Sequence, residues 1–224
     1  MRRFLRENGL SVFFLAIFLV TILAQSFAGQ HAFNAEQTAH GEPTTSWVRY
    51  LVSTDFGGAV MENWQSEFLQ FTLFILATVW LVQKGSNESK RLEDAGLESK
   101  RRQKVEEHAP EDAPAWAKLR GWRGRAYQNS LVLAMSAIFL ATWAAQSLSN
   151  WKRYNEEQQA HDEQTLRWGE YVLNANFWER TLQNWQSEFL AVGVMVVFTI
   201  YLRQRGSPES KPVGAPHEET GSSG

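Results

Sequence analysis

The chain has 224 residues, a length that fits one or two structural units. Its formal net charge of −2 gives no overall electrostatic case for binding nucleic acid. Cysteine is absent, which excludes disulfides, thiolate metal sites, iron–sulfur clusters and cysteine nucleophiles. Hydrophobic residues make up an ordinary 44% of the chain, but they are concentrated in four runs with the charges between them.

The four apolar runs predict membrane-spanning helices. They cover residues 9–28, 68–82, 131–148 and 189–202. About twenty residues at a rise of roughly 1.5 Å cross the hydrocarbon layer, which is about 30 Å thick. The second and fourth runs are shorter, and the alternative for them is a buried helix of a soluble protein. The long runs have no polar face, so we expect an all-α membrane protein with four transmembrane helices.

The first run also has features of a signal peptide. Arg2, Arg3 and Arg6 precede it, and Ser26-Phe27-Ala28 is tolerable near a cleavage site. The equivalent run at 131–148 is internal and cannot be a cleaved leader. We therefore expect the first run to remain as a membrane helix.

The sequence contains a tandem repeat. The heptapeptide Asn-Trp-Gln-Ser-Glu-Phe-Leu at 63–69 recurs at 184–190, an offset of 121 residues. More than a third of the positions between 2 and 90 are identical to their partners at this offset, and the best matches are polar. The pattern predicts a first two-span repeat at 1–90, a charged cytoplasmic linker at 91–122, a second repeat at 123–211 and a disordered tail at 212–224.

Lysine and arginine indicate the orientation. Most of the 22 basic residues lie at the N-terminus, in the linker and after the fourth run. The connections inside the repeats carry only Arg49, Lys152, Arg153, Arg167 and Arg180. Basic residues favour the cytoplasmic side, so we expect both termini and the linker inside and the two repeats parallel.

Both outer connections have helical features. Residues 30–39 lack helix breakers and should extend the first helix, and residues 46–52 predict a short amphipathic helix near the interface. Asp55 and Asn176 are suitable N-caps for the helices that follow. Gly85 and Gly206 are typical left-handed residues just after a helix end.

The linker should contact lipid at its end. Residues 115–125 combine tryptophan with lysine and arginine, which is typical of an interfacial segment touching anionic lipid. Nucleic acid is not expected as a partner, because Asp and Glu are interleaved with the basic residues of the linker. The expected partners are the lipid bilayer and, as an open alternative, a further copy of the chain in a homo-oligomer.

A duplicated set of polar residues stands at the outer edge of the runs. It comprises Gln25, Ser26, Asn63 and Glu67 in the first repeat and Gln146, Ser147, Asn184 and Glu188 in the second. Antiparallel neighbours bring these residues to the same depth, where a carboxylate is costly unless it has a partner. We expect a structural clamp in which Gln hydrogen-bonds Glu; a transport or proton-relay role is the alternative.

A weaker pattern points to metal. Glu36 and His40, like Glu157 and His161, are four residues apart, which places a carboxylate and an imidazole on one helical face. Such pairs are also common on solvated helices. No histidine lies within the apolar runs to bind a haem, and no phosphate loop or catalytic triad is present, so we expect no cofactor and no catalytic residue.

The motifs resemble a known family. Asn-Gly-Leu-Ser at 8–11, the repeated heptapeptide and the closing Gly-Ser-x-Glu-Ser-Lys are similar to those of small bacterial membrane proteins labelled only as a domain of unknown function. The resemblance implies a bacterial inner-membrane location and brings no activity. The sequence favours a non-enzymatic structural or interaction protein; the alternatives are a small transporter or channel using paired Glu, and a metal-binding membrane protein.

Overall fold

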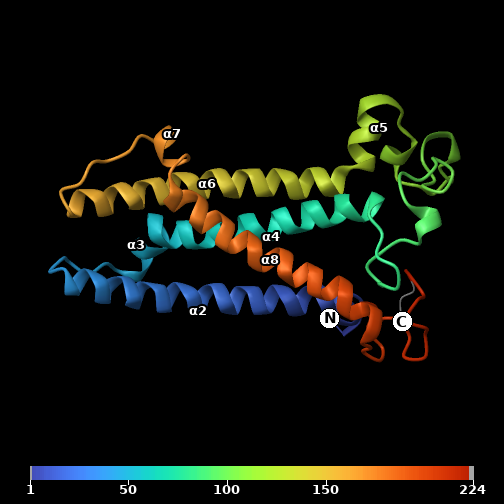
Figure 1. Cartoon of the computed structure of the whole chain (residues 1–224), viewed down its shortest axis with the longest axis horizontal. Helices are drawn as coiled ribbons and strands as arrows, with labels where there is room; N and C mark the ends of the chain where they lie inside the picture. Colours follow the sequence, from blue (N-terminus) through green and yellow to red (C-terminus); the bar gives the residue numbers. More distant parts are fainter. Residues whose placement is uncertain (1, 222–224) are drawn as a thin grey trace.

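The computed structural model describes residues 2–221, and it contains no β-strand in that range. Four long helices form the body of the molecule: α2 (Gly9–Ala39), α4 (Thr54–Trp80), α6 (Ser130–Ala160) and α8 (Ala175–Tyr201) (Figure 1). The all-α prediction is confirmed, and so is the extension of the first helix to residue 39.

The shorter elements lie at the two ends of the long helices. They are α1 (Arg2–Glu7), α3 (Trp47–Leu51), α5 (Gly121–Gln128), α7 (Trp168–Tyr171) and the 3₁₀ turns η1 (Leu92–Asp94), η2 (Glu106–His108) and η3 (Ala115–Lys118). The two caps α3 and α7 lie at one end, whereas α5, the linker and both chain termini lie at the other (Figure 1). The short helix predicted at 46–52 is therefore present as α3.

Two of the described helices, α2 and α6, are long and apolar enough to cross a membrane. Few residues of these helices are buried within the protein: 6% of the most apolar window of α2 and 17% of that of α6. α4 and α8 are long enough, but each begins with a polar half and is not apolar enough to be such a candidate. The structure thus supports two candidate spans where the sequence predicted four.

Helix α4 is the central element. It packs most extensively against α6 and next against α8, whereas α2 is joined to the bundle chiefly through α3. Its buried face carries Gly58, Gln65, Leu69 and Thr72, at spacings that place them on one side of a helix. Small residues such as Gly58 and Thr72 allow helix backbones to approach closely, as is common between membrane helices.

The predicted helix ends are wrong by a few residues. Ser53 caps α4 by accepting from the Phe56 amide at 3.2 Å, in place of Asp55. The equivalent Asn174 caps α8 in place of Asn176. Since the capping side chain must precede the first helical residue, the earlier polar residue takes the role.

The helices also end earlier than the glycines predicted. α4 stops at Trp80 with Leu81 extended, and α8 stops at Tyr201. Gly85 and Gly206 do adopt left-handed backbone, with φ of 87° and 82°, but within later turns. Both glycines are therefore turn residues and not helix caps.

The tail lies against the protein as far as residue 221. The Lys211 side chain, 1% exposed, donates to the carbonyls of Gly85, Pro216, His217 and Glu219 at 2.6–3.1 Å. Four backbone acceptors around one ammonium hold this segment, for which the composition predicted disorder. The last part of the predicted tail, 222–224, lies outside the described residues.

Candidate functional site

The short cap helices are anchored to the long helices by tryptophan. In the first half of the chain, Trp47 Nε1 of α3 donates to Ser26 Oγ of α2 at 3.0 Å. In the second half, Trp168 Nε1 of α7 donates to Ser147 Oγ of α6 at 3.2 Å. Both serines are nearly inaccessible. Two members of the predicted polar set therefore serve to fix the caps, with partners that the sequence did not indicate.

The loops leading to the caps are pinned in the same way. Asn34 donates to the Thr45 carbonyl at 3.0 Å and accepts from its amide at 2.7 Å. Asn155 makes the same pair of hydrogen bonds with Leu166, both at 2.9 Å. Each asparagine side chain thus satisfies both the backbone amide and the carbonyl of one loop residue, and it holds the loop against its helix.

A groove separates α2 from α4 and has a volume of about 600 Å³. Phe18, Thr21, Ile22 and Gln25 of α2 form one wall. Val60, Asn63, Trp64, Glu67, Phe68 and Phe71 of α4 form the other. The spacings of three, four and seven residues show that each wall is a single helix face. Three members of the predicted polar set, Gln25, Asn63 and Glu67, therefore meet in one groove.

The predicted clamp is not formed in this groove. Within residues 2–221 no hydrogen bond joins Gln25 to Glu67, although both line it. Asn63 instead donates from its side chain to the Ala59 carbonyl of its own helix at 2.8 Å. The Glu67 residue is exposed and lines the groove, and its counterpart Glu188 lies on α8, which packs against α4.

The corresponding space in the second half is filled by aromatic rings. Trp143 of α6 lies against Phe177, Trp178 and Trp185 of α8, with ring centroids 5.9–6.1 Å apart. Gln146 is completely buried on α6, and neither its amide nitrogen nor its carbonyl oxygen has a partner in the described chain. The Gln–Glu clamp predicted for this half is therefore not made by Gln146.

The remaining two members of the set lie on α8. The Asn184 side chain donates to the Arg180 carbonyl of its own helix at 2.8 Å. Glu188 is half-buried. Neither residue bridges two helices by a hydrogen bond among the described residues, so the second copy of the set is not assembled as one site.

A polar cluster that the sequence did not predict joins three helices. Glu62 of α4 accepts from the Asn150 amide of α6 through Oε1, and the same oxygen lies 3.3 Å from Arg180 Nη1 of α8. Nearby, Trp185 Nε1 of α8 donates to Gln65 Oε1 of α4 at 2.8 Å, and Gln65 is fully buried. These contacts connect the three packed helices α4, α6 and α8 at the end that carries the caps.

The repeat itself contains a signal for this cluster. At the offset of 121 residues, Glu62 matches Gln183, and Arg180 matches Ala59. Each of the two charged residues thus has an uncharged counterpart in the other half of the chain. This pair of charges therefore joins the two halves of the chain at positions where the halves differ.

The two tyrosines of the caps lie in aromatic surroundings outside the apolar runs. Tyr171 is 0% exposed, contacts the rings of Tyr154 and Phe177, and donates to Asn176 Oδ1 at 3.1 Å. Burial raises its pKa to about 12. Burial, and next the Asp55 charge, likewise raise the pKa of Tyr50.

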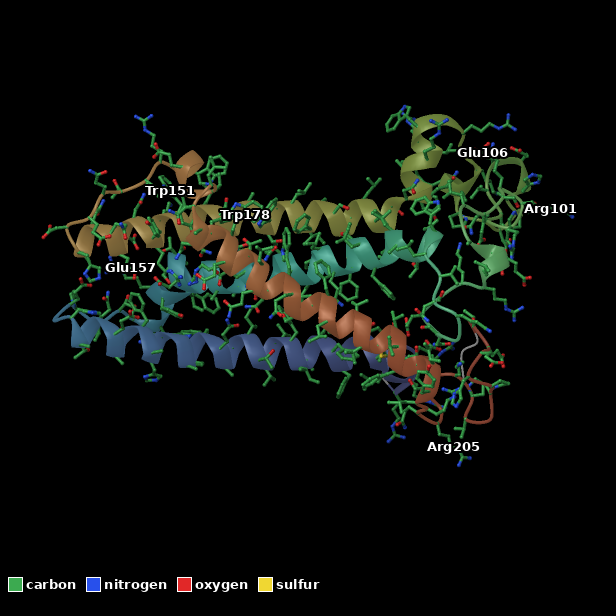
Figure 2. All side chains as sticks on the ribbon, viewed as in Figure 1. Arg101, Glu106, Trp151, Glu157, Trp178 and Arg205 are labelled. Atoms are coloured by element: carbon green, nitrogen blue, oxygen red, sulfur yellow. The ribbon has the colours of Figure 1, made fainter. Side chains whose placement is uncertain are left out.

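The residues of the metal hypothesis lie apart from these clusters. Glu36 and His40 are exposed at the end of α2, and Glu157 and His161 are exposed at the end of α6. Among residues 2–221, no group of three or more His, Asp or Glu side chains converges as metal ligands would. Figure 2 places Glu157 near the cap end of its helix, at the same end of the protein as Trp151.

The segment predicted to touch lipid lies at the opposite end. It forms η3 and the first half of α5, with Trp116 and Trp122 more than half exposed. The Arg123 guanidinium stands 5.4 Å from the Trp122 ring centroid, a cation–π contact. Exposed tryptophan beside arginine is the arrangement expected of an interfacial anchor.

Comparison with known proteins identifies the family. A family model described as "Domain of unknown function (DUF6766)" matches residues 1–222. The chain belongs to this family. The predicted resemblance to an uncharacterised family is therefore confirmed, and the family's description carries no activity. No curated protein and no solved structure matches the chain.

Proposed function

We propose that this protein is an integral membrane protein with a structural or interaction role and no catalytic activity, located in the bacterial inner membrane. The observation that carries the proposal is the use of polar groups at the cap end. Buried serine, glutamine, asparagine and glutamate side chains there hold helices to one another or to the caps, as in the Trp47–Ser26 and Glu62–Asn150 contacts. Meanwhile the apolar faces of α2 and α6 point outward.

The proposed topology has four spans in two parallel repeats. α2 and α6 cross fully, and the apolar runs at 68–82 and 189–202, which comprise the last halves of α4 and α8 and the residues just after them, complete the crossing. Both termini and the basic linker share one end of the helices, which is the arrangement that the positive-inside rule requires (Figure 1). That end lies in the cytoplasm in this proposal.

Absence of cysteine allows a direct test of the topology. Single cysteines replacing Thr38, Arg101 or Gln159 in intact cells are treated with a membrane-impermeant maleimide. The proposal expects labelling of the first and third from outside, and labelling of the second only after the membrane is opened. Labelling of all three from one side would refute the four-span topology.

A small transporter or channel is the second candidate. The exposed Glu67 in a groove is the observation that favours it. Proton and cation flux into proteoliposomes distinguishes the two functions. The structural role expects no flux above protein-free vesicles, whereas transport expects flux that Glu67→Gln or Glu188→Gln abolishes.

A further inference from the structure

We propose that the groove between α2 and α4 binds a phospholipid that carries a primary-ammonium headgroup. The ammonium pairs with Glu67, and one acyl chain lies against the aromatic walls. This inference extends the proposed function by giving the membrane protein a specific lipid ligand, and it rests on the placement of α2 and α4 in the bilayer.

Polarity changes along the groove in the direction that a lipid requires. On the α4 wall, Asn63, Glu67 and Phe71 follow one another at intervals of one turn. On the antiparallel α2 wall, Gln25 lies toward the cap end and Phe18 toward the interior of the apolar run. Amide and carboxylate groups thus stand at the level of the headgroups, with the aromatic residues deeper in the hydrocarbon.

The charge of the groove selects a cation. Glu67 is the only ionisable residue among those that line it, and none of them is basic. A primary ammonium has three N–H donors, which match the carboxylate of Glu67 and the amide oxygens of Gln25 and Asn63. A quaternary ammonium has the same charge and none of these donors.

The second half of the chain shows what occupies the equivalent space. Trp143 and Trp178 pack there between α6 and α8, and their partners at the repeat offset are Ile22 and Gly57. The first half therefore has an isoleucine and a glycine where the second has two indole rings. The resulting volume, about 600 Å³, is within the range of small-molecule sites and calls for an apolar occupant from outside the fold.

Photocrosslinking tests the proposal on the full-length protein in lipid nanodiscs. The probe is phosphatidylethanolamine with a diazirine on its acyl chain, and crosslinked peptides are mapped by mass spectrometry. We expect crosslinks concentrated on the groove faces of α2 and α4. We also expect unlabelled phosphatidylethanolamine to compete on the order of tenfold better than phosphatidylcholine, the margin of one charge-assisted hydrogen-bonded pair.

Two substitutions separate the acyl-chain and headgroup contacts. Ile22→Trp places the second copy's residue in the groove and should remove most of the groove crosslinking, whereas Leu19→Trp on the exposed face of the same helix should not. Glu67→Gln should keep the crosslinks and abolish the preference over phosphatidylcholine. Circular dichroism of each variant checks that the helices remain folded.

The outcomes that overturn the proposal are distinct. Crosslinks spread evenly over the lipid-facing sides of α2 and α6, or no effect of Ile22→Trp, would show that the groove holds no specific lipid while leaving the membrane placement intact. Absence of crosslinks from both helices would refute the membrane placement itself. Efficient dimer formation by a bis-maleimide at Thr21→Cys would assign the groove to a second copy of the chain.

Discussion

Removing the Glu62 carboxylate should destabilise the helical bundle. Its Oε1 lies 3.3 Å from Arg180 Nη1, and the two side chains are 16% and 25% exposed. At this distance and an effective dielectric constant near 20, the attraction is about 5 kcal/mol, most of which is offset by desolvation. The Asn150 amide, whose residue is 3% exposed, loses its acceptor as well.

The expected loss of unfolding free energy depends on which polar groups each variant leaves without a partner. Glu62→Ala leaves a buried amide unpaired and an arginine without its partner, which should cost about 2–4 kcal/mol of unfolding free energy. Arg180→Ala leaves Glu62 bonded to Asn150 and should cost about 1–2 kcal/mol. The double variant should reveal a coupling of roughly 1 kcal/mol. Gln183→Ala, at the exposed equivalent of Glu62, should change stability by less than about 0.5 kcal/mol.

Unfolding in mixed micelles at increasing SDS fraction, followed by circular dichroism, measures these differences. The variants must share one unfolding slope for the comparison to hold. Equal effects of Glu62→Ala and Gln183→Ala would refute the reasoning. So would a coupling of zero between positions 62 and 180, because the cluster would then be a surface contact without energetic weight.

Three further predictions concern the caps and the tail. Burial raises the pKa of the Tyr171 phenol from its ordinary value of 10.0 to about 12 in the folded protein. The buried neutral phenol therefore contributes roughly 2–3 kcal/mol to the free energy of unfolding, which is fully present below pH 10 and is lost as pH rises through 12. Tyr171→Phe should flatten that part of the stability profile measured by alkaline unfolding. Trp168→Phe removes the hydrogen bond to Ser147 and should lower the free energy of unfolding by about 1 kcal/mol. When Trp168→Phe is made in the Ser147→Ala variant, which already lacks that hydrogen bond, the loss should be measurably smaller. Lys211→Gln should expose 212–221 to limited proteolysis, whereas Lys90→Gln, at the half-buried equivalent, should not.

Local sequence rules predicted the helices well. Runs without breakers gave α2 to residue 39, and tryptophan with tyrosine on one face gave α3. The caps were displaced because Ser53 and Asp55 are both good capping residues, and propensity alone does not choose between neighbours. Such errors of two residues leave the positions of the functional side chains unchanged.

The contacts between helices could not be predicted in the same way. Antiparallel order predicted Gln25 and Glu67 at the same depth, and both line the groove, but it gave no distance between the two walls. Whether a hydrogen bond forms depends on the side chains that separate the helices. Ile22 and its partner Trp143 differ at this place, so one groove is open and the other is filled.

The repeated heptapeptide shows why identical sequence does not give identical environment. In α4, Gln65 and Ser66 are buried, because α4 lies between α6 and α8. In α8 the same residues, Gln186 and Ser187, are exposed, because α8 packs at the side of the bundle. The two copies of the heptapeptide therefore pack against different helices, and the same residue type is buried in one copy and exposed in the other.

The two halves of the chain use the matched positions differently. In the second half, Trp143 and Trp178 pack between α6 and α8, and Gln146 is buried without a partner, which costs about 1–3 kcal/mol for each unpaired polar group. The first copy keeps Gln25 accessible in an open groove and forgoes the aromatic packing. The proposed lipid would thus occupy the open groove of the first half, whereas aromatic rings pack in the equivalent space of the second half, and α4 forms one wall of the groove. The cluster around Glu62 connects α4 to α6 and α8, while other residues of α4 line the groove toward α2.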